Sequence, residues 1–210
     1  MLGFGKEKDL LKQGYRYLVG LDEVGRGSLF GPVVAVAVVF SSTFFQRKHP
    51  QWASQINDSK LLSPTKRVEL TRFILKDVCD LGIGYATHRE IDRLNIYWAS
   101  QLAMKRALED LTVTPGIILV DGYPLKGINY SQVAVSQGDK KIFSIAAASI
   151  VAKVFRDGLI KVLDQIYPGY KLNQNKGYGT EEHYQALEKL GPCGLHRKSF
   201  KLYKDRLLIK

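Results

Sequence analysis

Two apolar runs near the N-terminus dominate the pattern of hydrophobic and polar positions. The segments Tyr17–Leu21 (YLVGL) and Val33–Phe40 (VVAVAVVF) contain no charged side chain. Both runs are short for helices, and the second is rich in β-branched residues, so each is predicted to be a buried strand. A glycine-rich turn, GRGSLFGP, separates them, which favours an antiparallel hairpin.

Helical patterns follow in three places. Serine followed by proline is a favourable helix start, and it predicts a helix from Ser63 to about Asp80. The sequence THRE has the form of a capping box and predicts a helix from Thr87 to about Leu111. A third helix is expected over about Lys140–Tyr167, and the second one should break near Asn95.

Short apolar segments between these helices complete a mixed sheet. We expect strands at Leu81–Ala86, at Gly116–Val120 and at Gln132–Val135. Residues 1–14 have the pattern of a short amphipathic lead-in, residues 41–62 look irregular, and the last forty residues show helix and loop without a convincing strand. The whole pattern is typical of an α/β domain with a mixed sheet and a helical C-terminal extension.

Charge narrows the class of partner. The 210 residues include 31 lysines and arginines against 20 acids, which gives a net charge of +11 and favours nucleic acid or an anionic membrane as partner. No apolar run approaches 18 residues, and the N-terminus is too charged for a signal peptide, so a cytoplasmic location is expected. Only Cys79 and Cys193 occur, without a CxxC pair, which argues against a disulfide framework and for a reducing compartment.

Acidic residues stand where two of the predicted strands end. Asp22 and Glu23 follow the first strand, and Asp121 ends the strand IILV. The adjacent pair alone also fits a turn with solvated acids. If the two strands are neighbours, however, all three carboxylates meet in the crevice beyond the sheet, where α/β proteins bind ligands. Oxygen ligands suit Mg²⁺ or Mn²⁺, and acids inside a basic protein suggest metal-assisted phosphodiester cleavage.

The residues after this acid pair suit contact with a phosphate. In Gly25-Arg26-Gly27 the glycines allow close backbone approach, and an arginine can form a forked pair with a phosphate, although a plain hairpin turn explains the motif too. No HxH or HExxH spacing occurs, so a zinc site is not expected. His183 is interpreted as a packing or capping residue, and Ser144 and Ser149 as helix-packing residues.

Motifs along nearly the whole chain resemble type 2 ribonucleases H, the bacterial ribonuclease HII group. They are GLDEVGRGSLFGPVVAVAVVF (20–40), NDSKLLS (57–63), EIDRLNI (90–96), AMKRAL (103–108), ILVDG (118–122), GDKKIFSIAAASIVAKVFRD (138–157), YPGYKLNQNKGYGTEEH (167–183) and GPCGLHRKSF (191–200). The resemblance implies a ribonuclease H-like fold. It also implies an endonuclease that cleaves the RNA of RNA–DNA hybrids and nicks DNA duplexes 5′ of single embedded ribonucleotides, leaving 3′-hydroxyl and 5′-phosphate ends.

The same resemblance assigns the residues of the catalytic site. It implies that four acids bind two Mg²⁺ or Mn²⁺ ions, namely Asp22, Glu23, Asp121 and Asp139. Asp157 competes for the fourth place but is interpreted as a structural helix residue paired with a nearby base.

The resemblance also assigns residues that contact the substrate. It implies that Gly25, Arg26 and Gly27 read the ribose 2′-hydroxyl, which distinguishes RNA from DNA, and that Tyr178 stacks on the deoxyribose just 3′ of the ribonucleotide. Lys60 is interpreted as a phosphate contact, although a solvated lysine explains it equally well.

Some features separate this chain from its relatives or leave alternatives open. Tyr123 follows VDG where relatives often have asparagine, and it could alter substrate contacts. Residues 1–14 are too short for the extra domain of ribonuclease HIII, although an HIII-like preference for long hybrids and a non-catalytic nucleic-acid-binding protein remain alternatives. We expect a monomer with a catalytic domain at 1–167 and a helical substrate-binding extension at 168–210; the ending KDRLLIK shows no clear motif for a sliding clamp.

Overall fold

A five-stranded mixed sheet forms the centre of the molecule. The computed structural model describes residues 2–48 and 50–203. The sheet has the order β3-β2-β1-β4-β5. Strands β1 and β2 are antiparallel, as are β2 and β3, whereas β4 is parallel to both β1 and β5. The predicted hairpin and the mixed sheet are thus confirmed, with strands β1 (Tyr17–Val24), β2 (Val33–Ser41), β3 (Asp80–Ala86), β4 (Ile117–Asp121) and β5 (Gln132–Val135).

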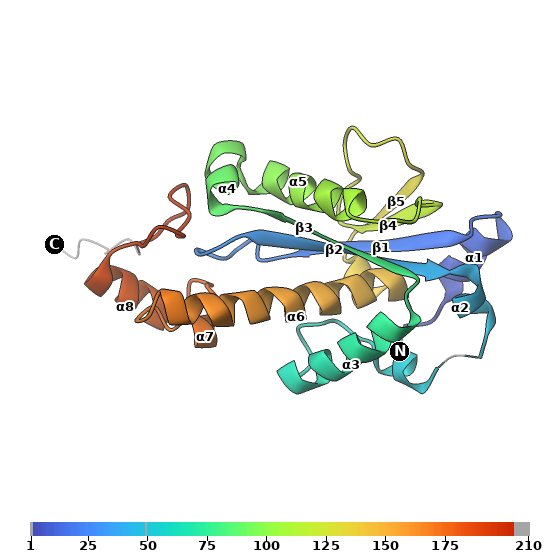
Figure 1. Cartoon of the computed structure of the whole chain (residues 1–210), viewed down its shortest axis with the longest axis horizontal. Coiled ribbons are helices and arrows are strands. Elements are labelled where there is room, and N and C mark those ends of the chain that lie inside the picture. The colour runs from blue at the N-terminus through green and yellow to red at the C-terminus, as the bar shows by residue number, and fades with distance from the viewer. Residues whose placement is uncertain (1, 49, 204–210) are drawn as a thin grey trace.

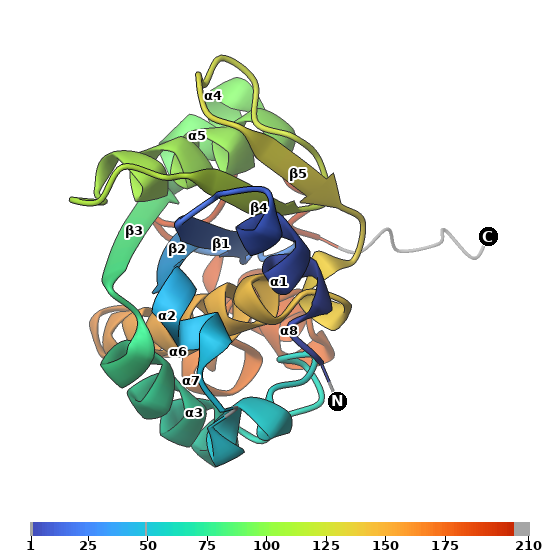
Figure 2. The ribbon, with the colours of Figure 1, turned by 90° about the vertical axis from the view of Figure 1, so that its right-hand side faces the viewer.

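Helices cover both faces of this sheet (Figures 1 and 2). Helices α4 (His88–Leu94) and α5 (Ile96–Glu109) lie on one face, and α6 (Phe143–Ile166) and α3 (Pro64–Asp77) on the other. The remaining helical elements are α1 (Gly5–Lys12), α2 (Ser42–Gln46), η1 (Gln51–Gln55), η2 (Gly138–Lys140), α7 (Leu172–Asn175) and α8 (Glu181–Leu190). No helix in the described ranges is both long and apolar enough to cross a membrane.

The continuous apolar run of β2 reflects burial on both faces. Val36 and Val38 pack into the cluster on the α6 side, whereas Ala35 and Val39 pack into the cluster on the α5 side. All four side chains are fully buried. Because successive strand residues point to opposite faces, a strand covered by helices on both sides shows no alternation of apolar and polar residues.

Glycines in the strands let the helices approach closely. A Cβ atom at Gly20 of β1 would lie 2.0 Å from the carbonyl oxygen of Ser144 in α6. At Gly84 of β3 it would lie 2.1 Å from the carbonyl oxygen of Ala103 in α5. The small-residue stretch of α6 therefore packs directly on the sheet backbone, as expected for its AAAS sequence.

Several element boundaries differ from the sequence prediction. Strand β1 continues to Val24 rather than ending at Leu21, so Asp22 and Glu23 lie within it. The helix that begins after Ser63 ends at Asp77 rather than near Asp80. Asp80 instead opens β3, and its carboxylate accepts hydrogen bonds from the backbone N–H groups of Thr112 and Val113. The segment 41–62, predicted to be irregular, contains α2 and η1. Helix α6 begins at Phe143 rather than near 140, because η2 occupies residues 138–140.

The predicted break near Asn95 is confirmed. Asn95 has a φ of 67° and separates α4 from α5. Its side chain accepts hydrogen bonds from the backbone N–H groups of Tyr97 and Trp98, which makes it the N-cap of α5.

The C-terminal helices pack against the start of the hairpin and one end of α6. A third apolar cluster joins Leu29 and Phe30 to Ile160 of α6 and to Leu172 and Leu187 of the C-terminal helices. Single β-bridges link residue 28 to 178 and residue 30 to 196. After β5 the described part of the chain contains no further strand, in agreement with the sequence pattern. The ending KDRLLIK (204–210) lies outside the described residues.

Candidate active site

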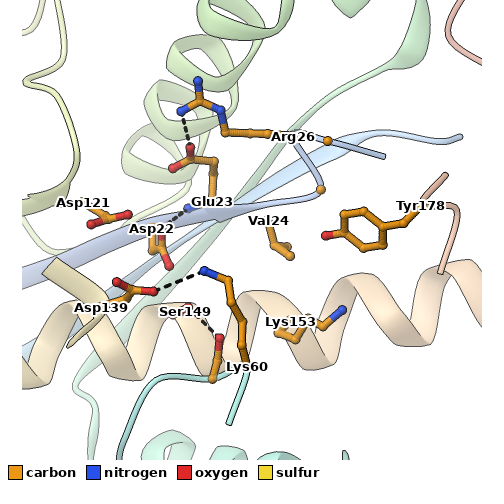
Figure 3. Close-up of a pocket in the computed structure, with 13 residues that line it drawn as sticks. Asp22, Glu23, Val24, Arg26, Lys60, Asp121, Asp139, Ser149, Lys153 and Tyr178 are labelled. Atoms are coloured by element: carbon orange, nitrogen blue, oxygen red, sulfur yellow. Dashed lines mark hydrogen bonds and ion pairs between the residues drawn. The ribbon is translucent and has the colours of Figure 1, made fainter. Parts of the chain in front are cut away.

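The parallel pairing of β1 with β4 brings the strand-end acids together. Leu21 lies opposite Val120 in the register, so Asp22 and Glu23, in the last part of β1, lie beside Asp121 at the end of β4. Asp139 belongs to η2, just before α6. Figure 3 shows Asp22, Asp121 and Asp139 close to one another, with the side chain of Glu23 on the other side of β1.

All residues proposed for the site line a single pocket of about 540 Å³. They are Asp22, Glu23, Gly25, Arg26, Gly27, Lys60, Asp121, Asp139 and Tyr178. The sequence interpretation missed Val24, Ser59 and Lys153, and took Ser149 as a packing residue only, although these four also line the pocket. Ser59 and Ser149 hydrogen-bond to each other at 3.1 Å between their hydroxyl oxygens. No sequence signal distinguishes these residues from ordinary helix and loop residues.

Asp22 is a buried carboxyl group in a negative environment. Only 4% of the residue is exposed, and its Oδ1 accepts a hydrogen bond of 2.8 Å from the backbone N–H of Glu23. Burial raises the pKa of Asp22 well above its usual value, and repulsion from Glu23 and Asp121 adds to the rise. A positive charge in the pocket would offset both the burial of this carboxylate and its repulsion from the neighbouring acids.

Glu23 is held by an arginine on one side only. Arg26 Nη1 lies 3.0 Å from Glu23 Oε1, whereas Oε2 is buried without a hydrogen-bond partner among the described residues. Burial raises the pKa of Glu23, and the Arg26 charge partly opposes that rise. Such an unpaired buried carboxylate oxygen is costly unless a ligand binds it.

Asp121 and Asp139 are joined through the backbone of the Gly-Asp motif. The N–H of Gly138 donates a hydrogen bond of 2.6 Å to Asp121 Oδ1. Burial raises the pKa of Asp121, while this hydrogen bond opposes the rise. Asp139 is 6% exposed, and Lys60 Nζ approaches its Oδ2 to 3.7 Å.

Asp157, the alternative fourth acid, does not line this pocket. Its carboxylate pairs with Lys153 at 2.8 Å and with Arg67 at 3.8 Å. The interpretation of Asp157 as a structural residue paired with a base is therefore confirmed.

The carboxylates suit a hard cation that keeps part of its water shell. Burial raises the pKa values of Asp22, Glu23 and Asp121, and Glu23 Oε2 lacks a partner among the described residues. Across the described ranges, no group of three or more acidic, histidine or cysteine side chains is gathered so that it could hold a metal ion by itself. Mg²⁺ normally completes its shell with waters and substrate phosphate oxygens rather than a cage of protein ligands. The set of oxygen ligands therefore fits an open magnesium or manganese site.

Opposite the acids, a buried arginine supports the loop that follows β1. Gly25 has a φ of 94°, and a Cβ atom there would lie 2.2 Å from Nε of Arg156. The Arg156 guanidinium donates hydrogen bonds to the carbonyl oxygens of Pro32, Phe30 and Lys176. It also lies over the ring of Tyr178, 5.6 Å from the centroid, and donates to the Ser28 hydroxyl. One side chain thus connects the glycine loop to the loop that carries Tyr178.

A second buried arginine holds the same glycine loop from another side. Arg197 donates hydrogen bonds to the carbonyl oxygens of Gly31 and Arg26, at 2.9 and 2.8 Å. Burial and the nearby charge of Arg156 lower the pKa of Arg197 to about 9. No ion pair among the described residues includes either buried arginine. Sequence reasoning missed both, because a buried arginine looks like a surface arginine in the sequence.

Two buried histidines fix the backbone at Tyr178. The N–H of Cys193 donates to His196 Nδ1, so the proton of neutral His196 is on Nε2. That nitrogen lies 3.1 Å from His183 Nε2, and His183 Nδ1 lies 2.9 Å from the carbonyl oxygen of Tyr178. These contacts form one chain of hydrogen bonds ending at Tyr178. His183 is fully buried, so the expected packing role is confirmed.

Solved structures share this fold. The ribonuclease H2 of Pyrococcus horikoshii OT3 superimposes with a TM-score of 0.73 at 25% identity, over 89% of this chain and 94% of that one. Bst-RNase HIII in complex with Mn²⁺ gives a TM-score of 0.65 at 15% identity, over 90% of this chain and 68% of that one. The sheet, its flanking helices and these likenesses define the class as a type 2 ribonuclease H fold.

Sequence relatives define the family within that class. The family model described as Ribonuclease HII matches residues 19–203. Curated ribonucleases HII from Listeria innocua and Caldicellulosiruptor saccharolyticus are 45% and 44% identical, covering 96% and 94% of this chain and 74% and 93% of theirs. The chain belongs to the ribonuclease HII family and is therefore a ribonuclease H endonuclease, so the non-catalytic alternative is wrong.

Proposed function

We propose that this enzyme hydrolyses the RNA strand of RNA–DNA hybrids and nicks DNA duplexes on the 5′ side of single ribonucleotides. The observation that carries the proposal is the pocket itself. Three acids at the ends of two parallel strands, together with Asp139 of η2, face a glycine-arginine-glycine loop and a tyrosine across one cavity. Cleavage would break the bond between the preceding 3′ oxygen and the phosphorus, leaving 3′-hydroxyl and 5′-phosphate ends.

Asp22, Glu23, Asp121 and Asp139 would hold the divalent cations. When bound, such cations favour deprotonation of the attacking water and neutralise charge on the departing 3′ oxygen. The low exposure of Asp22 and Asp139 limits water around the reacting phosphate and strengthens electrostatic interactions there. Lys60 is mostly exposed beside Asp139, where its ammonium group could contact a phosphate of the bound strand.

The opposite wall would recognise the ribose. Gly27 leaves the backbone open to the sugar, since the space beside it holds no atom within 4 Å of a built Cβ, whereas Gly25 allows Arg156 to pack against the loop. Tyr178 lines the same pocket; Arg156 packs on its ring, and His183 contacts its backbone carbonyl oxygen. In this proposal the loop contacts the 2′-hydroxyl, which distinguishes RNA from DNA, and Tyr178 stacks on the next deoxyribose. The C-terminal helical part, residues 168–210, would help to hold the duplex.

Comparing two substrates tests this function. We expect Mg²⁺- or Mn²⁺-dependent nicking of a DNA duplex with one ribonucleotide, and cleavage of a long RNA–DNA hybrid. End labelling should place the nick 5′ of the ribonucleotide with a 3′-hydroxyl terminus. An all-DNA duplex of the same sequence is the control. Cleavage of long hybrids without nicking at single ribonucleotides would instead support the HIII-like alternative.

A further inference from the structure

An aromatic surface continues from the acid side of the pocket. Tyr97 and Trp98 lie at the start of α5, and Tyr123 follows Asp121 by two residues. Tyr97 lies edge-on to both other rings, with centroids 5.1 Å from Trp98 and 6.3 Å from Tyr123. We call Tyr97, Trp98 and Tyr123 the aromatic platform.

Two of the three platform residues are open to solvent. Tyr123 is 66% exposed and Trp98 is 43% exposed. The chain turns outward at Gly122, whose φ is 77°, immediately after the catalytic strand. Neighbouring exposed aromatic rings are unusual on a soluble surface without a binding role.

The platform shares its walls with the catalytic pocket. A small cleft of about 10 Å³ lies between the aromatic rings of Tyr97 and Tyr123 and the side chains of Glu23, Arg26 and Asp121. A strand bound over the acids would therefore reach the platform without crossing other protein elements. The cleft has room for about one water-sized group.

A buried hydroxyl group in this cleft lacks a partner. Ser100 is 4% exposed, lines the cleft, and its Oγ forms no hydrogen bond within residues 2–48 and 50–203. Buried hydroxyl groups are normally hydrogen-bonded. An oxygen of a bound strand, or a water bridging to it, would satisfy Ser100.

Charge around the platform matches a nucleic-acid strand. Lys126 Nζ lies 5.1 Å from the centroid of the Trp98 ring, and Arg26 borders the cleft. Protein surfaces that bind nucleic-acid strands combine basic groups for phosphates with aromatic rings for bases and sugars. The exposed ring face of Trp98 and the Lys126 cation offer this combination.

We infer that the aromatic platform is a second nucleic-acid contact, which holds the strand flanking the cleaved phosphate on the Asp121 side. The inference rests on the proposed action on nucleic acid. Tyr123 and Trp98 would contact a base or sugar of that strand, while Lys126 would contact a phosphate. The contact lies on the opposite side of the acids from Tyr178, so the two aromatic sites would bind the substrate on both sides of the cleaved bond.

The intrinsic fluorescence of Trp98 tests this contact directly. The chain has only two tryptophans, and the other, Trp52, is 7% exposed. We would add a DNA duplex with one ribonucleotide, in the presence of a chelator that prevents cleavage. The emission of the wild-type enzyme should be quenched on binding, and the change should be absent in Trp98→Phe.

Binding of the same labelled duplex measures the contribution of Tyr123. Anisotropy titration should give at least about fivefold weaker binding for Tyr123→Ala, the low end of the loss expected for one stacking contact. The matched control is Tyr85→Ala, which removes another exposed ring (54% exposed) on the edge strand β3 and should bind like wild type. All three variants change exposed side chains, and thermal melting verifies that they fold.

The outcomes separate the two hypotheses. If wild type neither binds nor nicks the duplex, the proposed function fails. If wild type binds and nicks normally while Trp98 emission is unchanged and Tyr123→Ala binds like wild type, the platform is wrong and the function stands. Quenching that depends on protein concentration without nucleic acid would also overturn the platform, because it would identify a self-association surface.

Discussion

The two walls of the catalytic pocket bury ionisable groups in opposite ways. On the acid wall, Asp22 and Glu23 are buried beside other carboxylates, and one oxygen of Glu23 has no partner within the described chain. Behind the opposite wall, Arg156 and Arg197 are fully buried, and backbone carbonyl oxygens accept most of their hydrogen bonds, although Arg197 Nη2 has no partner among the described residues.

This difference shows which buried charges the chain itself can stabilise. Carbonyl oxygens can satisfy a buried guanidinium without any counter-ion, because its N–H donors form a fixed fork. The arginine wall is therefore a rigid support formed by the chain itself. Like-charged carboxylates cannot satisfy one another, so the acid wall remains costly until a cation binds. Mutations in the two walls should consequently affect different properties.

The largest expected effect is the loss of catalysis in Asp121→Asn. The amide oxygen can still accept the Gly138 hydrogen bond, but the negative charge for the cation is lost. We expect cleavage to be abolished, a decrease of at least about 100-fold, while duplex binding is retained and the free energy of unfolding does not fall. Single-turnover cleavage, anisotropy and urea unfolding measure the three quantities. Wild-type cleavage by this variant would refute the assignment of the acid wall.

The arginine wall should show the opposite result, a loss of stability. Arg156→Met removes the donor to the carbonyl oxygens of Pro32 and Lys176 and one donor to the Ser28 hydroxyl, whereas the Phe30 carbonyl oxygen still accepts from that hydroxyl. Because each unpaired buried acceptor costs about 1–3 kcal/mol, we expect the free energy of unfolding to fall by at least about 3 kcal/mol.

Arg197→Met is the matched comparison for Arg156→Met. Arg197 donates to two carbonyl oxygens, those of Gly31 and Arg26, but its Nη2 is already buried without a partner among the described residues. Because the substitution also removes this unpaired donor, it should cost less, about 2 kcal/mol. Urea unfolding measures both variants. Equal stability of wild type and Arg156→Met would show that the wall does not depend on this guanidinium.

The same contrast explains which parts of the site the sequence could predict. The sequence points to Asp22, Glu23 and Asp121 because these acids directly follow apolar runs. Such runs are visible locally, without knowledge of the tertiary structure. That prediction requires β1 and β4 to be neighbours in the sheet, and the observed register shows that they are. The fold class followed from the same alternation of apolar strands and amphipathic helices.

The supporting residues could not be found in this way. Arg156 lies 124 residues from its acceptor Pro32, and His196 meets His183 only because the C-terminal loop folds back. Such contacts depend on tertiary packing, which no periodicity encodes. The helix end at Asp77 was missed for a similar reason, because the carboxylate of Asp80 is anchored by residues from after α5.

The histidine pair should give the C-terminal loop a distinct pH dependence. Burial, together with the nearby His183, lowers the pKa of His196 to about 4, and burial also lowers the pKa of His183. In the unfolded chain His196 therefore binds its proton near pH 6.5, whereas in the folded chain it does so only near pH 4. The stability contributed by neutral His196 is complete above about pH 6.5 and decreases as the pH falls toward 4, by up to about 3 kcal/mol.

The acid wall has the opposite sign. The pKa values of Asp22, Glu23 and Asp121 are raised by burial, so the folded chain binds their protons more tightly, and this contribution decreases as the pH rises through the raised values. Urea unfolding of wild type and His196→Gln between pH 4 and 7 separates the contribution of the histidine pair from that of the acid wall. The variant should lose stability less steeply on acidification than wild type. Parallel pH profiles would show that the histidine pair does not titrate as expected.

The smallest expected effect concerns the exposed lysine at the edge of the acid wall. The side chain of Lys60 is 77% exposed and lies 3.7 Å from Asp139, so Lys60→Gln should change stability by no more than about 1 kcal/mol. If Lys60 contacts a phosphate, the variant should bind duplex more weakly, and the slope of log K against log salt should shrink by about 1. Lys140→Gln is the control, since Lys140 lies 3.8 Å from Asp58 and does not line the pocket. Anisotropy titrations over a range of salt concentrations measure both slopes. Identical slopes for Lys60→Gln and wild type would identify Lys60 as a solvated surface residue.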